Sequence, residues 1–310
     1  MQKFELTILG CSSATPTSDR NPTSQVLNVH EQLFLIDCGE AAQIQLRKYK
    51  IRFQKIDRIF ISHLHGDHYL GLVGLLGTMH LLGRTKKLHV YAPKGLKEIV
   101  DIQHHYSDTF LRFPLEIREL DTQNRKIVFE NDKVSVETIP LNHRIPCCGF
   151  LFREKPGERK MIVEKLAEYK IPVAYISKIK QGGDYVTADG RIIPNAELTL
   201  PPDPPRSYAY CSDTLYHPAL IGQVNGAGLL YHEATFASDM AARAAETFHS
   251  TAAQAASIAL QAGVKQLIIG HYSARYTELD VLHAEAKAIF ENTLLAEEGK
   301  TYPVPAPTLI

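Results

Sequence analysis

The 310-residue chain is 45% hydrophobic and 22% charged, which is enough apolar sequence for a sizeable core in one large domain or two modest ones. Because 34 Lys and Arg balance 34 Asp and Glu, overall charge does not indicate a nucleic-acid partner, which would need a local basic patch. Five cysteines without a C-x-x-C pair argue against a disulfide framework or a zinc knuckle and suit a reducing cytoplasm. We expect neither a signal peptide nor a membrane-spanning segment.

Apolar periodicity predicts many strands, with helices between them. In the first half of the chain the patterns predict strands over 4–8, 25–29 and 32–36, a helix from Glu40, a strand over 59–61, a helix over 70–82, a strand over 88–91, a helix over 97–105, and strands over 115–120, 127–129 and 134–139. In the second half they predict strands over 207–211 and 229–232, a helix over 251–262, a strand over 266–270 and a helix over 279–294. This order is typical of a layered α/β architecture with sheets inside and helices outside.

Residues 153–206 do not continue this pattern of predicted strands and helices. Between Arg153 and Gly183, eight Lys and Arg face four Glu, and a proline cluster follows at 201–205. We interpret the segment as an insertion that leaves the core and returns to it. Its charge alone fits a long solvated surface excursion as well as a functional element.

The sequence Ser62-His63-Leu64-His65-Gly66-Asp67-His68 places four metal-ligand side chains within six residues, directly after a predicted buried strand. At a strand end the chain is free to turn, so alternate side chains can converge on one point. His63 and His65 are expected to bind one metal ion, and Asp67 and His68 a second. Imidazole and carboxylate donors suit zinc or manganese. The alternative is a polar loop with chance histidines, which the density of ligand-type residues disfavours.

Three further candidates, His143, Asp213 and His271, each follow a predicted strand. Taken singly, each is more often an ordinary loop residue than a ligand. Their shared placement is informative, because strand ends are where α/β sheets build sites. A carboxylate such as Asp213 can bridge two metal ions that lie about 3.5–4 Å apart.

The run His63-x-His65-x-Asp67-His68, with the three downstream candidates, resembles the metallo-β-lactamase superfamily over nearly the whole chain. The resemblance implies a four-layer αββα sandwich, formed by one domain over 1–310 with 153–206 as an inserted flexible arm. It also implies two Zn²⁺ ions per subunit, with Mn²⁺ as an alternative. The expected ligands are His63, His65 and His143 at one ion and Asp67, His68 and His271 at the other, with Asp213 bridging.

Two further segments look like signatures of the ribonuclease Z family within that superfamily. They are His232-Glu233-Ala234-Thr235 after a strand and His249-Ser250-Thr251 at the start of a helix. The loop 16–21 is similar to that family's tRNA-contacting loop, with Ser18 where the family has a lysine. The insertion lies where that family carries an arm that grips the tRNA elbow. Without the resemblance, His232 and Glu233 fit a buried pair at a strand end, and His249 fits a helix residue without chemistry.

The resemblance implies a zinc-dependent endoribonuclease that removes 3′ trailers from precursor tRNA, leaving a 3′-hydroxyl on the tRNA and a 5′-phosphate on the trailer. Asp67 is expected to orient the attacking water and accept its proton, and His249 to protonate the leaving ribose oxygen. Glu233 is expected to orient His249. The resemblance further implies a cytoplasmic homodimer in which one subunit's arm positions substrate for the other's site.

Two other functions remain open at this point. A small-molecule phosphodiesterase or arylsulfatase of the same fold would use the same ligand set but would not need a basic insertion. A non-catalytic RNA-binding member would have lost its metals, and the intact ligand set argues against it.

Overall fold

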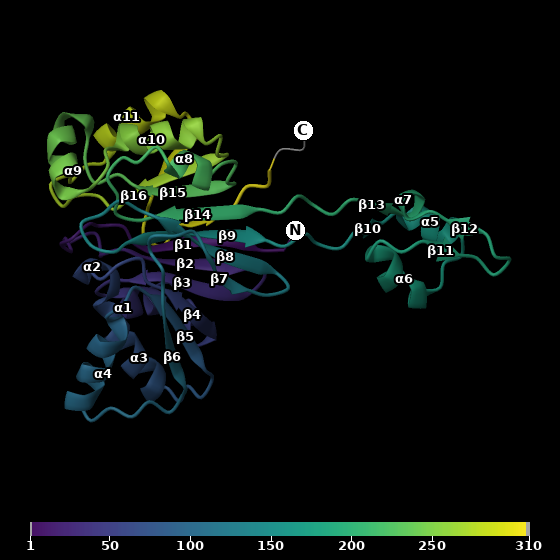
Figure 1. Cartoon of the computed structure of the whole chain (residues 1–310), viewed down its shortest axis with the longest axis horizontal. Coiled ribbons are helices and arrows are strands. Elements are labelled where there is room, and N and C mark those ends of the chain that lie inside the picture. Colours follow the sequence, from purple (N-terminus) through teal and green to yellow (C-terminus); the bar gives the residue numbers. More distant parts are fainter. Residues whose placement is uncertain (1, 308–310) are drawn as a thin grey trace. The chain divides into compact units, whose positions relative to one another are not determined.

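The computed structural model describes residues 2–307. Contacts divide these residues into two compact units, one formed by 2–154 with 206–307 and the other by 155–205. The larger unit contains two seven-stranded sheets and the helices that cover them (Figure 1).

The first sheet has the strand order β18-β1-β2-β3-β4-β5-β6. Its strands are β1 (Phe4–Gly10), β2 (Ser24–Val29), β3 (Gln32–Cys38), β4 (Ile56–Phe60), β5 (Leu88–Ala92), β6 (Leu115–Glu119) and β18 (Thr301–Pro303). Strands β3 to β6 are parallel, so their carboxyl ends meet at one edge. The outer face is covered by α1 (Ala42–Lys48), α3 (Gly71–Leu81) and α4 (Leu96–Tyr106), whose apolar side chains share one buried cluster with this sheet.

The second sheet has the order β17-β16-β15-β14-β9-β8-β7. Its strands are β7 (Ile127–Glu130), β8 (Val134–Pro140), β9 (Cys148–Glu154), β14 (Ser207–Cys211), β15 (Leu229–Glu233), β16 (Gln266–Gly270) and β17 (Thr293–Leu295). Strands β8, β14, β15 and β16 run in one direction, because β9 is antiparallel to both β8 and β14. Helices α10 (Ala252–Gln261) and α11 (Asp280–Ile289) cover the outer face.

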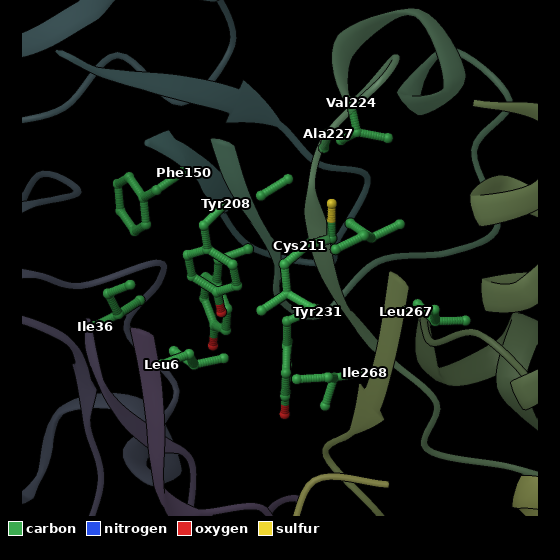
Figure 2. Packing of buried hydrophobic residues seen from close by; sticks show 14 of the residues in the cluster. Leu6, Ile36, Phe150, Tyr208, Cys211, Val224, Ala227, Tyr231, Leu267 and Ile268 are labelled. Atoms are coloured by element: carbon green, nitrogen blue, oxygen red, sulfur yellow. The ribbon is translucent and has the colours of Figure 1, made fainter. Parts of the chain in front are cut away.

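The two sheets face each other across an apolar core. Leu6 and Ile36 of the first sheet pack in the same cluster as Phe150 and Tyr208 of the second, as Figure 2 shows. All four side chains are fully buried, and burial of a Leu, Ile or Phe side chain contributes about 1.5–3 kcal/mol to folding. The layers are therefore helix, sheet, sheet, helix, which confirms the expected αββα sandwich.

Short elements complete the larger unit. They are α2 (Gly66–Tyr69), α8 (Leu220–Gln223), α9 (Ala241–Thr247) and the 3₁₀ turns η1 (Phe53–Lys55) and η2 (Ser238–Met240). Thr251 caps α10 in a capping box with Gln254, which fixes the start of that helix. Among residues 2–307, no helix has the length and apolar character needed to cross a bilayer.

The smaller unit, residues 155–205, has secondary structure and a core of its own. It contains α5 (Val163–Glu168), α6 (Val173–Lys180), α7 (Asn195–Leu198) and two short strand pairs, β10 (Lys160–Met161) with β13 (Thr199–Leu200) and β11 (Tyr185–Val186) with β12 (Ile192–Ile193). Its buried cluster is Ile171, Ile179, Tyr185, Ile193 and Leu198. The insertion is therefore a small folded unit.

A buried ion pair joins the two strands on either side of this insertion. Glu154 ends β9, and Arg206 immediately precedes β14. The Arg206 side chain donates from Nε to Glu154 Oε2 at 2.9 Å and from Nη2 to Oε1 at 2.6 Å. His30 Nε2 lies 2.6 Å from the same Oε1, and the carbonyl of Gln2 accepts from Arg206 Nη2 at 2.8 Å. Both sheets are thus tied together where the insertion begins and ends.

Three sequence expectations differ from the structure. The predicted helix 279–294 is wrong at its carboxyl end, because the chain leaves the helix after Ile289 and Thr293–Leu295 pairs with β16. Strand β9 was not predicted. Its last residues, Arg153 and Glu154, pair with β8, so the smaller unit begins at Lys155 and not at Arg153, and it ends at Pro205.

Candidate metal centre

The seven expected ligands lie at the carboxyl ends of strands from both sheets. The segment His63–His68 follows β4, and its last residues form the short helix α2. His143 follows β8, Asp213 follows β14, and His271 follows β16. Since these three strands run in the same direction, their carboxyl ends bring the downstream side chains to one edge.

One group of donors consists of His63, His65, His143 and Asp213, with one ligand atom from each within 4.8 Å of the others. His65 Nδ1 lies 3.1 Å from His63 Nε2 and 3.2 Å from His143 Nε2. Asp213 Oδ2 lies 3.5 Å from His63 Nε2 and 3.8 Å from His143 Nε2. Three imidazoles and one carboxylate oxygen therefore converge.

A second group consists of Asp67, His68 and His271. The Nε2 atoms of His68 and His271 lie 3.3 Å apart, and Asp67 Oδ2 lies 3.3 and 3.4 Å from them. Asp213 Oδ1 is 3.4 Å from His68 Nε2 and 3.2 Å from His271 Nε2. Asp213 thus presents one oxygen to each group.

The pKa shifts of three of these histidines fit a metal site. Burial lowers the pKa of His63, His65 and His143, so each favours the neutral form that has a free lone pair. Burial also opposes a charge on His68, but the carboxylates of Asp67 and Asp213 outweigh it and raise the pKa of His68. Imidazole nitrogens and carboxylate oxygens that face one another are the donors that zinc or manganese prefers.

Asp37 holds His68 and the start of the motif, and the sequence interpretation missed it. It lies near the end of β3 with a φ of 53°, a backbone conformation that costs energy in a residue other than glycine. Its carboxylate accepts from Ser62 N at 2.7 Å, Ser62 Oγ at 2.8 Å and Tyr210 OH at 2.6 Å, and it lies 2.7 Å from His68 Nδ1. Such contacts fix the ring orientation of a ligating histidine.

Other expected ligands are held in the same way. The carbonyl oxygen of Phe248 lies 2.9 Å from His143 Nδ1, and Thr235 Oγ1 lies 2.9 Å from His271 Nδ1. The backbone N–H of Ala14 donates to Asp67 Oδ2 at 2.7 Å. Ala14 lies two residues before the loop 16–21, so the chain leading into this loop is tied to the donor cluster.

His249 and Glu233 form a pair beside both donor groups. His249 Nδ1 lies 3.0 Å from Glu233 Oε1 and 4.0 Å from Asp213 Oδ2. The side chain of His249 is 16% exposed, whereas Glu233 is fully buried. Burial disfavours a charge on His249, but the Glu233 carboxylate outweighs this effect and raises the pKa of His249 to about 9. His249 can therefore hold a proton at neutral pH at the edge of the cluster.

Glu233 is itself fixed by four donors. The backbone N–H groups of Thr214 and Ser250 donate to Oε1, and the N–H and hydroxyl of Thr235 donate to Oε2. His232, the other half of the predicted signature, lies inside β15 with Nδ1 donating to the Glu233 carbonyl, and it belongs to neither donor group.

The sandwich and the His/Asp donor clusters define a metal-dependent hydrolase of the metallo-β-lactamase fold. The metallo-β-lactamase fold protein YhfI from Bacillus subtilis has a similar structure, with a TM-score of 0.68 and 18% identity, covering 98% of this chain and 100% of that one. A family model described as Anti-Pycsar protein Apyc1 matches residues 4–156, which contain His63–His68 and His143 but not the donors downstream.

Proteins that match nearly the whole chain identify its family within this class. A ribonuclease Z of Bacteroides fragilis is 53% identical over 299 residues, which cover 96% of this chain and 98% of that protein. The human short-form tRNase Z structure has a TM-score of 0.70 and 25% identity and covers 97% of this chain and 99% of that one. The chain belongs to the ribonuclease Z family.

Proposed function

We propose that this chain removes the 3′ trailer from precursor tRNA by hydrolysis, leaving a 3′-hydroxyl on the tRNA and a 5′-phosphate on the trailer. The observation that carries the proposal is the joining of two donor groups through Asp213 with the His249–Glu233 pair beside them, in a chain of this family. The test is incubation with a 3′-extended precursor tRNA, followed by mapping of both new ends.

The proposed cofactor is two Zn²⁺ ions per subunit, with Mn²⁺ as the alternative. His63, His65 and His143 would hold one ion and Asp67, His68 and His271 the other, with Asp213 bridging. Zinc at such a site supplies Lewis acidity, which lowers the pKa of a water molecule and offsets negative charge on phosphate oxygens.

Asp67 is proposed to orient the attacking water and to accept its proton. Burial disfavours the ionised carboxylate, but the neighbouring His68 and His271 outweigh it and lower the pKa of Asp67. The carboxylate is therefore charged at neutral pH, and the bond from Ala14 N fixes Oδ2.

His249 is proposed to donate the proton that the leaving ribose 3′-oxygen needs. It is more exposed than the buried donors His63 and His68, and it lies beside both groups. Glu233 acts through His249, because its bond to Nδ1 leaves Nε2 as the nitrogen available to the substrate. A positioned general acid contributes roughly 10²–10⁴-fold to rate.

The insertion is proposed to bind the tRNA body. RNA helices are recognised by shape through phosphates and 2′-hydroxyls, so the contacts need exposed cations rather than base-reading groups. Within residues 155–205, Lys170, Lys178 and Arg191 are exposed and make no ion pair, which leaves them available for phosphate.

We further propose a cytoplasmic homodimer in which the insertion of one subunit serves the site of the other. The support for a second copy is apolar exposure around α3 and α4, where Leu81, Tyr106 and Phe110 are 80%, 85% and 79% exposed. Large exposed apolar side chains in one region are typical of protein–protein contacts. Sedimentation of the purified chain measures the subunit number.

A further inference from the structure

A dense basic run lies outside the metal centre and outside the insertion. Residues 47–55 contain five Lys and Arg and no acidic residue. In the structure the run connects the end of α1 to the start of β4, and all five cations are exposed.

Part of this run lines a hollow in the surface. Lys50, Arg52 and Lys55 contribute to the wall of a cavity of about 290 Å³, together with Lys3. Val26 and Leu33 of the first sheet also line it. The hollow therefore combines four cations with a mixed polar and apolar floor, to which Thr7 and Asn28 also contribute.

Three cations of the hollow have no acidic partner in the part of the chain that the structure describes. Among residues 2–307, the side chains of Lys50, Arg52 and Lys55 make no hydrogen bond or ion pair, and the two acids of the hollow, Glu5 and Glu31, both face Lys3 at 3.9 and 3.6 Å. By contrast, carboxylates pair with Lys97, Lys126 and Lys287. The hollow therefore concentrates positive charge in a chain whose net charge is zero.

The hollow and the metal centre lie at opposite ends of the same strands. Lys55 immediately precedes β4, whereas His63 follows its carboxyl end. Leu33 lies at the start of β3 and Asp37 near its end. Strand β4 spans five residues, which is roughly 16 Å at 3.3 Å per residue. The basic hollow is therefore not part of the proposed catalytic site.

We propose that this hollow binds the phosphodiester backbone of precursor tRNA as a second contact, separate from the metal centre. Spaced cations around a concave surface match the spaced phosphates of a convex backbone. A membrane surface fits less well, because Tyr49, Ile51 and Phe53 pack against the core instead of projecting as membrane anchors. The choice of RNA among polyanions rests on the proposed function.

The test compares two triple variants with the same change in charge. Lys50→Gln/Arg52→Gln/Lys55→Gln removes the hollow's cations, and Lys97→Gln/Lys126→Gln/Lys287→Gln removes paired cations elsewhere. Both are made with Asp67→Ala, in which we expect no cleavage. Binding is measured over a salt series with precursor tRNA and with a short single-stranded RNA of unrelated sequence. Thermal unfolding and metal content check the fold.

We expect only the hollow variant to show a smaller salt slope, by about 2 in the logarithm of the binding constant per logarithm of salt, since each lost contact removes about 0.7–0.9. A smaller slope with precursor tRNA supports the proposal, and a change confined to the unrelated RNA overturns it. Equal slopes in both variants overturn the proposal. So does charge-dependent binding to phosphatidylglycerol vesicles in place of RNA. Failure of the wild-type chain to cut precursor tRNA would instead reject the proposed function and leave the binding result standing.

Discussion

His249 Nδ1 lies 3.0 Å from a carboxylate oxygen of Glu233, at the edge of a cluster in which His143 and His271 are the neighbouring rings. The pair joins a side chain that reaches the surface to one that is fully buried. This geometry suits a proton donor held by a positioning carboxylate.

We therefore expect His249→Ala to slow single-turnover cleavage of precursor tRNA by about 10²–10⁴-fold, because the leaving oxygen loses its proton donor. Metal content measured by elemental analysis should stay unchanged. His249 also lies within ligand distance of Asp213 and His271. A variant that loses metal would show that His249 is a ligand and that the proton comes from elsewhere.

Replacement of Asp37 by Asn should weaken metal binding by roughly 10–100-fold, the usual effect of removing a carboxylate that orients a ligating histidine. The reason is that His68, Ser62 and Tyr210 all depend on its two oxygens. Metal titration of the apo protein measures the change. Thr138→Ser, at a buried position on β8 outside the donor groups, is the matched control. If metal affinity is unchanged in Asp37→Asn, Asp37 does not position His68 for metal binding.

Replacing residues 155–205 with a short Gly/Ser linker should separate two activities. Hydrolysis of a small phosphodiester should be nearly unchanged, since the larger unit has its own core and donor cluster. Cleavage of precursor tRNA should collapse through a higher KM. Equal loss on both substrates would mean that the deletion damaged the core. Full activity on precursor tRNA would contradict the role of the insertion and favour a small-molecule phosphodiesterase.

The Glu154–Arg206 pair predicts a pH-dependent stability. Burial raises the pKa of Glu154, but the hydrogen bonds from Arg206 outweigh it, so the folded pKa is below the ordinary value of 4.5. The stabilisation is therefore fully present above about pH 4.5 and is lost as the pH falls through the lower, folded pKa.

Arg206→Gln should lower the free energy of unfolding at pH 7 by about 1–3 kcal/mol, because Glu154 loses the guanidinium but keeps the backbone N–H of residue 206 and His30. Urea unfolding of both proteins over a pH series measures this difference, which should narrow in acid. A constant difference at every pH would exclude the ionised pair as its source.

The sequence predicts the donor residues of the candidate metal centre better than the residues that hold those donors in place. Four of the expected ligands lie in one short segment, and His143, Asp213 and His271 each follow a recognisable strand. Asp37 was missed because its role depends on Tyr210, which lies on the opposite sheet and far away in sequence. The contact forms only when the two sheets pack against each other, so the sequence alone does not show it.

The errors in the fold have similar causes. Thr293–Leu295 has an apolar pattern that fits the end of a helix, but its pairing with β16 decides its structure. The two-residue strands of the insertion are too short to show the alternation of apolar and polar residues that predicts a strand. The strand β9 runs directly into the insertion, and its polar end, Arg153 and Glu154, resembles the charged sequence that follows.

The most direct test of the account is cleavage of an end-labelled, 3′-extended precursor tRNA by the purified, metal-loaded chain, with both new ends mapped. The account predicts a single cut at the tRNA 3′ end that leaves a 3′-hydroxyl on the tRNA and a 5′-phosphate on the trailer, and that a chelator abolishes. An intact precursor, or a cut that leaves a 3′-phosphate on the tRNA, would contradict it.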